Sequence, residues 1–384
     1  MNISFQKLFF AIATVFLIFV ILILAKSILI PLSFALLISF ILYPLVKKFE
    51  SWGINKILSA FFSIFTVVLI IGGTIFLFST QIMDITKEFS NFQDKIISTI
   101  GDVTEYINKN VGFIPDLGKH EIIDRTKEWL EKSSGSLVKQ TFNSTTSFIT
   151  GLFLTIVFTF LILIYREGLI RAFSAFAAEP KRKKVVKMYK SIQQVGKKYL
   201  SGMMILIVVI GFANSIGLLI IGIDNPFFFG FLGSFLAIIP YVGTVLGAII
   251  PVLYAIVAFN SLGMAISIAV LFWFVQLLSD NLLSPKIVGS SININALTAI
   301  LSLIVGAVVW GVAGMILFLP FAAMLKIVCE EYEELKPIAL LIGNKNYQDD
   351  DDGNEWFNKW KNKIKHWFGK KGTDTPQNST NKEV

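Results

Sequence analysis

The chain has 384 residues, of which 54% are hydrophobic and 16% are charged, and its net charge is +8 at neutral pH. Soluble domains carry about 25% charged residues, so this composition excludes an ordinary soluble domain and is typical of an integral membrane protein. The basic residues gather beside apolar runs, so we expect no nucleic-acid partner. One cysteine excludes an internal disulfide, and with only two histidines we expect no metal site and no cofactor.

Eight apolar segments predict an all-α, polytopic integral membrane protein, because about 20 helical residues cross the ~30 Å hydrocarbon layer of a bilayer. The second segment follows the first at once, so we expect an uncleaved helix and not a signal peptide. The run 225–325 holds only Asp280 and Lys286 as charges and must contain broken or re-entrant helices. The segments are 8–25, 28–45, 57–78, 147–165, 200–223, 227–259, 262–279 and 294–328.

Lysine and arginine predict the orientation, because short loops rich in these residues face the cytoplasm. They are concentrated in 46–56 and 166–198, which should lie inside together with both chain termini. Topology beyond Asp224 stays open, because the later runs could either cross the membrane or dip and return. The expected divisions are N-terminal membrane helices in 1–78, an extracytoplasmic helical segment in 79–146, the main membrane core in 147–340 and a cytoplasmic tail in 341–384.

Two amphipathic helices are expected outside the hydrocarbon layer. A basic one near 181–199 should lie on anionic lipid on the inner side. An outer one has apolar residues at steps of three and four, so it packs on the protein's own membrane helices, contacts another copy or covers a path. Its apolar face consists of Ile82, Ile85, Phe89, Phe92, Ile96, Ile100, Val103 and Ile107.

The tail carries a further amphipathic helix near 355–369, with tryptophans on one face and lysines beside and opposite them. Tryptophan prefers the headgroup layer and lysine binds anionic phosphates there. We therefore expect a membrane-surface anchor, against the alternative of a disordered polar tail. Its residues are Trp356, Trp360, Trp367, Lys361, Lys363 and Lys365.

Two motifs in the main core break the apolar pattern. Pro240-Tyr241-Val242-Gly243, followed by Gly247 and Pro251, predicts a broken helix, since proline removes a backbone donor and glycine allows close approach. Such a break either lines a transport cavity or is a bent packing helix. The second motif holds Gln276, Asp280, Asn281, Pro285 and Lys286, where the two charges could pair, or Asp280 alone could bind a cation or proton. The alternative is a helix end with a capping Asp280 and an interfacial Lys286.

Glycines and a proline mark the last apolar run, 294–328, which is either one tilted helix or a hairpin. Gly306, Gly311 and Gly314, with Pro320, are the residues that we expect to bend it or to make it double back. No phosphate-binding G-x-x-x-x-G-K-[ST] loop, H-E-x-x-H motif or G-x-S-x-G motif occurs, so we expect neither ATP hydrolysis nor another enzyme activity.

These motifs together resemble the autoinducer-2 exporter family of bacterial permeases. The resemblance spans residues 5–340, and Asn295-Ala296-Leu297 departs from it where the family often has a proline. It implies an oligomeric permease of the bacterial inner membrane, and family members are linked to autoinducer-2 export or to sodium/proton antiport. The matching residues are Pro240-Tyr241-x-Gly243, Gly247 and Pro251; Asp280-Asn281, Pro285-Lys286 and Gly289; and Trp310-Gly311-Val312-Ala313-Gly314-Met315 with Pro320.

We therefore expect a secondary transporter that exports a small hydrophilic solute, with autoinducer-2 as a candidate. Asp280 would carry an ion or proton and Lys286 would balance its charge. The alternatives are a sodium (lithium)/proton antiporter, a non-transporting membrane scaffold, and the membrane subunit of an ATP-driven system. Expected partners are the bilayer, the solute or a monovalent cation or proton, and further copies of the chain. The expected path residues are Pro240, Tyr241, Gly243, Gly247, Pro251, Gln276, Asp280, Asn281, Pro285, Lys286, Gly311 and Gly314.

Overall fold

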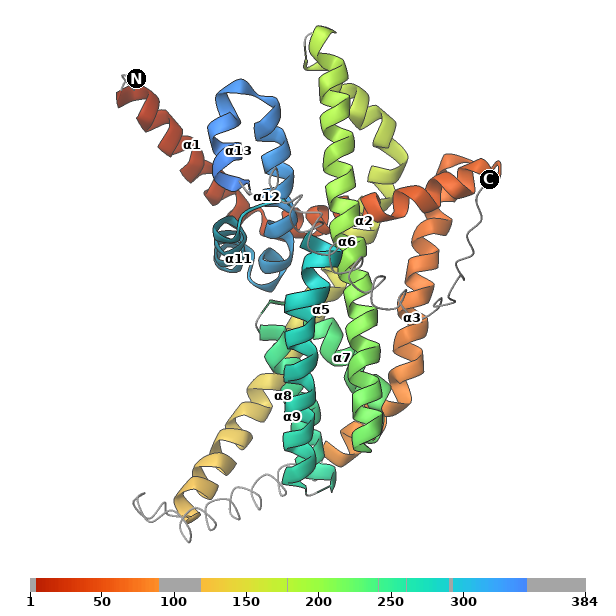
Figure 1. Ribbon diagram of the computed structural model, residues 1–384, viewed down its shortest axis with the longest axis vertical. Coiled ribbons are helices and arrows are strands. Elements are labelled where there is room, and N and C mark those ends of the chain that lie inside the picture. The colour runs from red at the N-terminus through yellow and green to blue at the C-terminus, as the bar shows by residue number, and fades with distance from the viewer. Residues whose placement is uncertain are drawn as a thin grey trace, which may run out of the picture.

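The computed structural model describes residues 5–89, 119–177, 179–240, 242–259, 261–289 and 293–343. Within these ranges the chain is all-α, with one isolated bridge between Ile294 and Gly343 and no strand. Seven helices of this part of the chain are long and apolar enough to cross a membrane, and three shorter apolar helices accompany them. The expected polytopic membrane fold is therefore confirmed (Figure 1).

The described helices are joined by short connections, except across residues 90–118, which lie outside the described residues. The first five elements are α1 (Phe5–Leu24), α2 (Lys26–Ser51), α3 (Lys56–Phe89), α5 (Lys119–Ala175) and α6 (Glu179–Ile221). They are followed by α7 (Pro226–Leu236), α8 (Val242–Phe259), α9 (Leu262–Leu278) and two π-helical turns, η1 (Ser279–Leu283) and η2 (Pro285–Gly289). The last elements are α11 (Ala296–Trp310), α12 (Val312–Glu331), the 3-10 turn η3 (Glu333–Leu335) and α13 (Lys336–Ile342).

Three helices are longer than the apolar segments that predicted them. α3 continues through residue 78 to Phe89, α5 begins at Lys119, and α6 begins at Glu179. None of them contains a proline beyond its first turn, so the polar residues extend each helix without a break. The basic stretch near 181–199 is therefore the first half of α6 and not a separate helix.

The long run after Asp224 is broken, as expected. Asn225 has a φ of +56°, and Pro226 opens α7, whose 11 residues reach only about 16 Å at 1.5 Å per residue. The chain turns near Pro240, and α8 runs back along α7. A Cβ placed on Gly247 would lie 2.9 Å from the Cα of Gly233, so the two helices form a tight hairpin.

The last apolar run is a second hairpin, made of α11 and α12. Gly311, with a φ of +62°, forms the turn between them. Gly306 and Gly314 bring the two backbones together, since a Cβ on Gly306 would lie 2.4 Å from the carbonyl oxygen of Gly314. The structure thus decides between the two alternatives that the sequence left open.

Asn295 links the start of this second hairpin to the end of α13. Its Oδ1 accepts a hydrogen bond from the backbone N–H of Thr298 at 2.8 Å and caps α11. Its Nδ2 donates to the carbonyl oxygens of Leu341 at 2.6 Å and Gly343 at 3.1 Å, at the end of α13. Asn295 therefore both caps α11 and binds the end of α13, at a position where the resembling family often has a proline.

We expect Asn295→Ala to destabilise the protein by about 2 kcal/mol, because it removes a helix cap and two hydrogen bonds at once. Asn295→Ser keeps a capping oxygen and loses the two donor bonds, so its effect should be about half as large. Thermal unfolding of the purified protein in detergent would measure both. Equal stability of the two variants would contradict the double role.

α6 is the central helix and contacts both hairpins and α2 (Figure 1). Gly196 lets α6 approach α2 and α12, since its missing Cβ would meet the side chains of Phe40 and Met324 at 2.7 and 2.8 Å. α1 is linked to α11 by Trp310, whose Nε1 donates to the carbonyl oxygen of Leu22 at 2.9 Å. These contacts fix the second hairpin beside α6.

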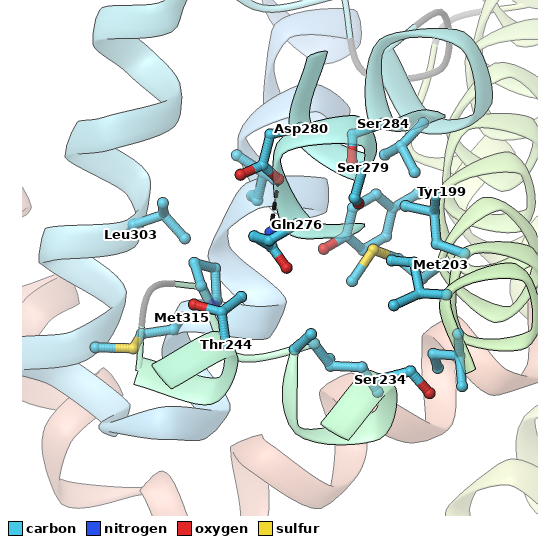
Figure 2. Close-up of a pocket in the computed structure, with 18 residues that line it drawn as sticks. Tyr199, Met203, Ser234, Thr244, Gln276, Ser279, Asp280, Ser284, Leu303 and Met315 are labelled. Atoms are coloured by element: carbon cyan, nitrogen blue, oxygen red, sulfur yellow. Dashed lines mark hydrogen bonds between the residues drawn. The ribbon is translucent and has the colours of Figure 1, made fainter. Parts of the chain in front are cut away.

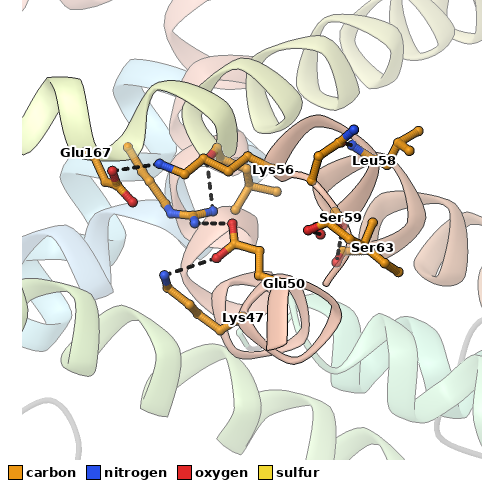
Figure 3. Close-up of polar contacts among 11 residues, drawn as sticks. Lys47, Glu50, Lys56, Leu58, Ser59, Ser63 and Glu167 are labelled. Carbon is orange, nitrogen blue, oxygen red and sulfur yellow. Dashed lines mark hydrogen bonds and ion pairs between the residues drawn. The ribbon is translucent and has the colours of Figure 1, made fainter. Parts of the chain in front are cut away.

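A cluster of charges joins α2, α3 and α5 at the end of the bundle that we expect to face the cytoplasm (Figure 3). Arg166 of α5 is only 5% exposed and forms an ion pair with Glu50 of α2. Glu50 also pairs with Lys47 at 3.0 Å, and Lys56 of α3 pairs with Glu167 at 2.7 Å. Nothing in the sequence pattern singled out this buried arginine.

Candidate functional site

A cavity of about 360 Å³ lies where the two hairpins meet α6 and the end of α9 (Figure 2). α6 contributes a mostly apolar wall, and η1 contributes polar groups beside it (Figure 2). The hairpin residues come from the turn of α7–α8 and from the facing sides of α11 and α12. The lining residues are Tyr199, Met203, Leu206, Ile207, Ile210, Ser234, Ala237, Ile238, Pro240, Thr244, Gln276, Ser279, Asp280, Ser284, Val288, Leu303, Met315 and Leu319.

Asp280 gives this cavity its charge. Its Oδ1 accepts a hydrogen bond from Nε2 of Gln276 at 2.8 Å, which orients both side chains beside the cavity (Figure 2). No lysine, arginine or histidine occurs among the described residues that line the space. An unbalanced carboxylate attracts cations and repels anions, so the cavity suits a cation or a neutral polar molecule.

Hydroxyl groups supply the remaining polar surface. Ser234 of α7 and Ser279 of η1 are each 2% exposed, and Tyr199 of α6 is 3% exposed. The Ser234 hydroxyl donates to the carbonyl oxygen of Phe231 at 2.9 Å, in its own helix. Thr244 and Ser284 complete the set. Hydroxyls both donate and accept, so they match a solute that carries hydroxyl groups of its own.

The π-helical turns explain how Asp280 reaches the cavity. Pro285 has no N–H, so the carbonyl of Asn281 loses its usual helical donor and the ladder of hydrogen bonds is interrupted there. The chain widens into η1 and η2 on either side of Ser284. π-Helical turns inside longer helices are frequent at functional sites, because they rotate side chains out of the regular register.

The structure brings some of the predicted path residues together and separates others. Pro240, Gln276 and Asp280 line the cavity. Asn281 is exposed, and its Nδ2 donates to the carbonyl oxygen of Leu277 in its own turn at 2.8 Å. Lys286 is exposed, as Asp280 is, and no ion pair joins the two side chains within the described part of the chain. Charge balance by Lys286 is therefore not observed.

The remaining predicted residues hold the hairpins together. Gly243 lies against the carbonyl of Leu236, and Pro251 of α8 is fully buried. Gly247 allows α8 to approach α7, and Gly314 allows α12 to approach α11. Gly311 forms the turn between α11 and α12, and Pro285 interrupts the helix beside Ser284. Some predicted residues lie outside the described part of the chain. They are Tyr241, the outer stripe from Phe92 to Ile107, and the membrane-surface anchor with Trp356, Trp360, Trp367, Lys361, Lys363 and Lys365.

Sequence reasoning missed most of the hydroxyls and the whole α6 wall. Ser279 and Ser284 flank Asp280 in one motif, so their proximity could have been inferred. Tyr199, Ser234 and Thr244 stand alone in apolar helices, where a single hydroxyl gives no periodic signal.

Comparison with known proteins agrees with this architecture. A sequence model described as "AI-2E family transporter" matches residues 9–334. The chain belongs to the AI-2E transporter family. The AI-2 transport protein TqsA of Escherichia coli strain K12 is 22% identical over 325 residues, which cover 84% of this chain and 91% of TqsA. Within this family the chain is a multi-pass membrane protein with a role in membrane transport.

Two Bacillus subtilis strain 168 proteins with provisional names as transport proteins are also similar. YrrI is 22% identical over 313 residues, covering 79% of this chain and 86% of YrrI. YueF is 34% identical over 141 residues, covering 37% of this chain and 38% of YueF.

Proposed function

We propose that this chain is a secondary transporter that exports a small, neutral, hydroxyl-bearing solute through the cavity beside Asp280. The observation that carries the proposal is one carboxylate, held by Gln276, in a cavity whose other described lining residues bear hydroxyls or apolar side chains. Such a lining disfavours an anionic solute. Autoinducer-2 is the first solute to test, because it is a small sugar-like diol and TqsA is named for AI-2 transport.

In the proposed mechanism Asp280 couples transport to protons. Hydroxyls from α6, α7, α8 and η1 exchange hydrogen bonds with the solute, replacing those it made to water. Both hairpins line the cavity, so we propose that their movement against α6 opens it to one side of the membrane at a time. Asp280 is the proposed proton carrier, and the Gln276 amide holds its carboxylate beside the cavity.

The second candidate is sodium or lithium/proton antiport. It is favoured by the same carboxylate, because no basic residue among the described lining residues competes with a cation for it. For both candidates we propose a bacterial cytoplasmic membrane with both termini inside, lipid contact through the tail, and assembly with further copies of the chain.

We expect Asp280→Asn to lower transport by about tenfold or more, because asparagine keeps the shape of the side chain and loses the charge and the exchangeable proton. The measurement is flux in proteoliposomes with an internal pH dye, adding sodium, lithium, potassium and an autoinducer-type diol in turn. Asp224→Asn is the matched control, since Asp224 is exposed in the α6–α7 connection, outside the cavity.

The outcomes separate the candidates. Diol efflux that needs Asp280 supports the proposed exporter, whereas a pH change triggered by sodium or lithium and lost in the variant supports antiport. Wild-type protein that moves neither the diol nor a cation would contradict both and favour the scaffold.

A further inference from the structure

The cavity wall formed by α6 continues beyond the cavity itself. Its lining residues from Tyr199 to Ile210 share one face of the helix. Asn214 follows Ile210 by four residues, so it lies on the same face, one turn further along α6. It is therefore the next side chain that a solute would meet after leaving the cavity in that direction.

Asn214 is buried without a complete set of hydrogen bonds. The residue is 3% exposed, and its Oδ1 has no hydrogen-bond partner within the described part of the chain. Its neighbour Ser215, by contrast, is fully buried and donates to the carbonyl oxygen of Gly211 at 2.7 Å. Buried polar atoms are nearly always paired, and an unpaired one is especially costly where bulk water is absent.

An apolar cluster closes the route just beyond Asn214. Leu218, one turn further along α6, packs there with Phe229 of α7, Tyr254 of α8 and Phe272 of α9. The α7–α8 hairpin thus takes part in both regions, since Ser234 lines the cavity and Phe229 belongs to the cluster. A movement of this hairpin away from α6 would widen the cavity towards Asn214, and separation of the cluster would open the route beyond it.

We propose that Asn214 is a second solute contact, placed between the cavity and this apolar cluster. The inference rests on the proposed transport function and deepens it. The free Oδ1 is an acceptor, so it would bind a hydroxyl hydrogen of the solute or, in an antiporter, a monovalent cation. An amide has no proton to exchange, so Asn214 would pass the solute on while Asp280 remains the proton carrier.

The first test measures water access and needs no knowledge of the solute. Cys329 is the single cysteine, so Cys329→Ser provides a cysteine-free protein into which Asn214→Cys is placed. Ser39→Cys is the matched control, because Ser39 is equally buried at 3% exposed and lies on α2, outside the cavity. Labelling with a small water-soluble maleimide in membranes should be about tenfold faster at position 214 than at position 39. Equal rates would overturn the proposal.

The second test separates transport from folding. Asn214→Leu replaces the unpaired amide by an apolar group of similar size, so the thermal unfolding midpoint should stay equal or rise. Flux should nevertheless fall by about tenfold, because the solute loses its contact with Oδ1 of Asn214. Ser215→Ala, which changes the adjacent buried residue, should leave flux unchanged. Full flux with a raised midpoint would show a packing flaw only and overturn the proposal.

The flux measurement distinguishes failure of the role of Asn214 from failure of the proposed transport function. If wild-type protein carries flux and Asn214→Leu matches it, only the role of Asn214 fails. If wild-type protein moves no solute or cation, the proposed function fails first. Asn214→Asp identifies the bound group: a higher apparent affinity for sodium or lithium indicates a cation, and a new pH dependence of diol flux indicates a hydroxyl solute. A variant identical to wild type in both respects overturns the contact.

Discussion

Replacement of Arg166 by leucine should destabilise the helix bundle by about 3 kcal/mol, because it leaves Glu50 as a largely buried charge without its main partner. The guanidinium of Arg166 forms the ion pair with Glu50, donates to the carbonyl oxygen of Leu163 at 3.2 Å, and lies 5.4 Å from the ring centre of Tyr43. We place the effect at the lower end of the usual range because Lys47 still pairs with Glu50.

Unfolding of the purified protein in detergent, followed against temperature, would measure this effect. Lys56→Gln is the control: the Lys56–Glu167 pair has side chains 52% and 44% exposed, so its loss should cost less than about 1 kcal/mol. The double variant Arg166→Leu with Glu50→Gln should recover part of the stability, since it removes the uncompensated charge. Similar losses for Arg166→Leu and Lys56→Gln would mean that the cluster is open to water.

The positions of the membrane segments and of the main break were predictable, because they depend only on local composition. Apolar runs located the membrane segments, and prolines and glycines indicated that the run after Asp224 must break. Helix lengths were not predictable in the same way. The polar beginnings of α5 and α6 look like separate surface helices, but nothing in their sequences interrupts the backbone hydrogen bonds, so each continues into a span.

The candidate site was predictable only in part. Asp280 stood out because a charge is rare in so apolar a region, and Pro240 because it breaks a helix. The expected pairing of Asp280 with Lys286 ignored their spacing. Residues six apart differ by about 240° around an α-helix, so the two side chains point to different sides, and the π-helical turns do not bring them together. Contacts between distant helices, such as Arg166 with Glu50, leave no local pattern at all.

Gly314→Ala, which adds one methyl group, should destabilise the protein by about 3 kcal/mol, at the high end for overpacking. The added Cβ would lie only 1.9 Å from the carbonyl oxygen of Gly306. That neighbour is backbone and not a flexible side chain, so α11 and α12 must separate. Leu303 and Met315 line the cavity from these two helices, so we expect transport to fall together with the unfolding midpoint.

Gly263→Ala gives the matched control, because it is the same substitution in α9 at an exposed position. The new Cβ would meet only the Ser261 hydroxyl oxygen, at 3.8 Å. Alanine favours the middle of a helix over glycine by about 0.5–1 kcal/mol and the first turn, where Gly263 lies, by less, so this variant should be at least as stable as wild type. The two changes therefore have different expected effects, and the difference comes mainly from the distance between helices. If Gly314→Ala also stabilised the protein, the backbones of α11 and α12 could not be in contact. The cavity wall that we assign to Leu303 and Met315 would then be wrong as well.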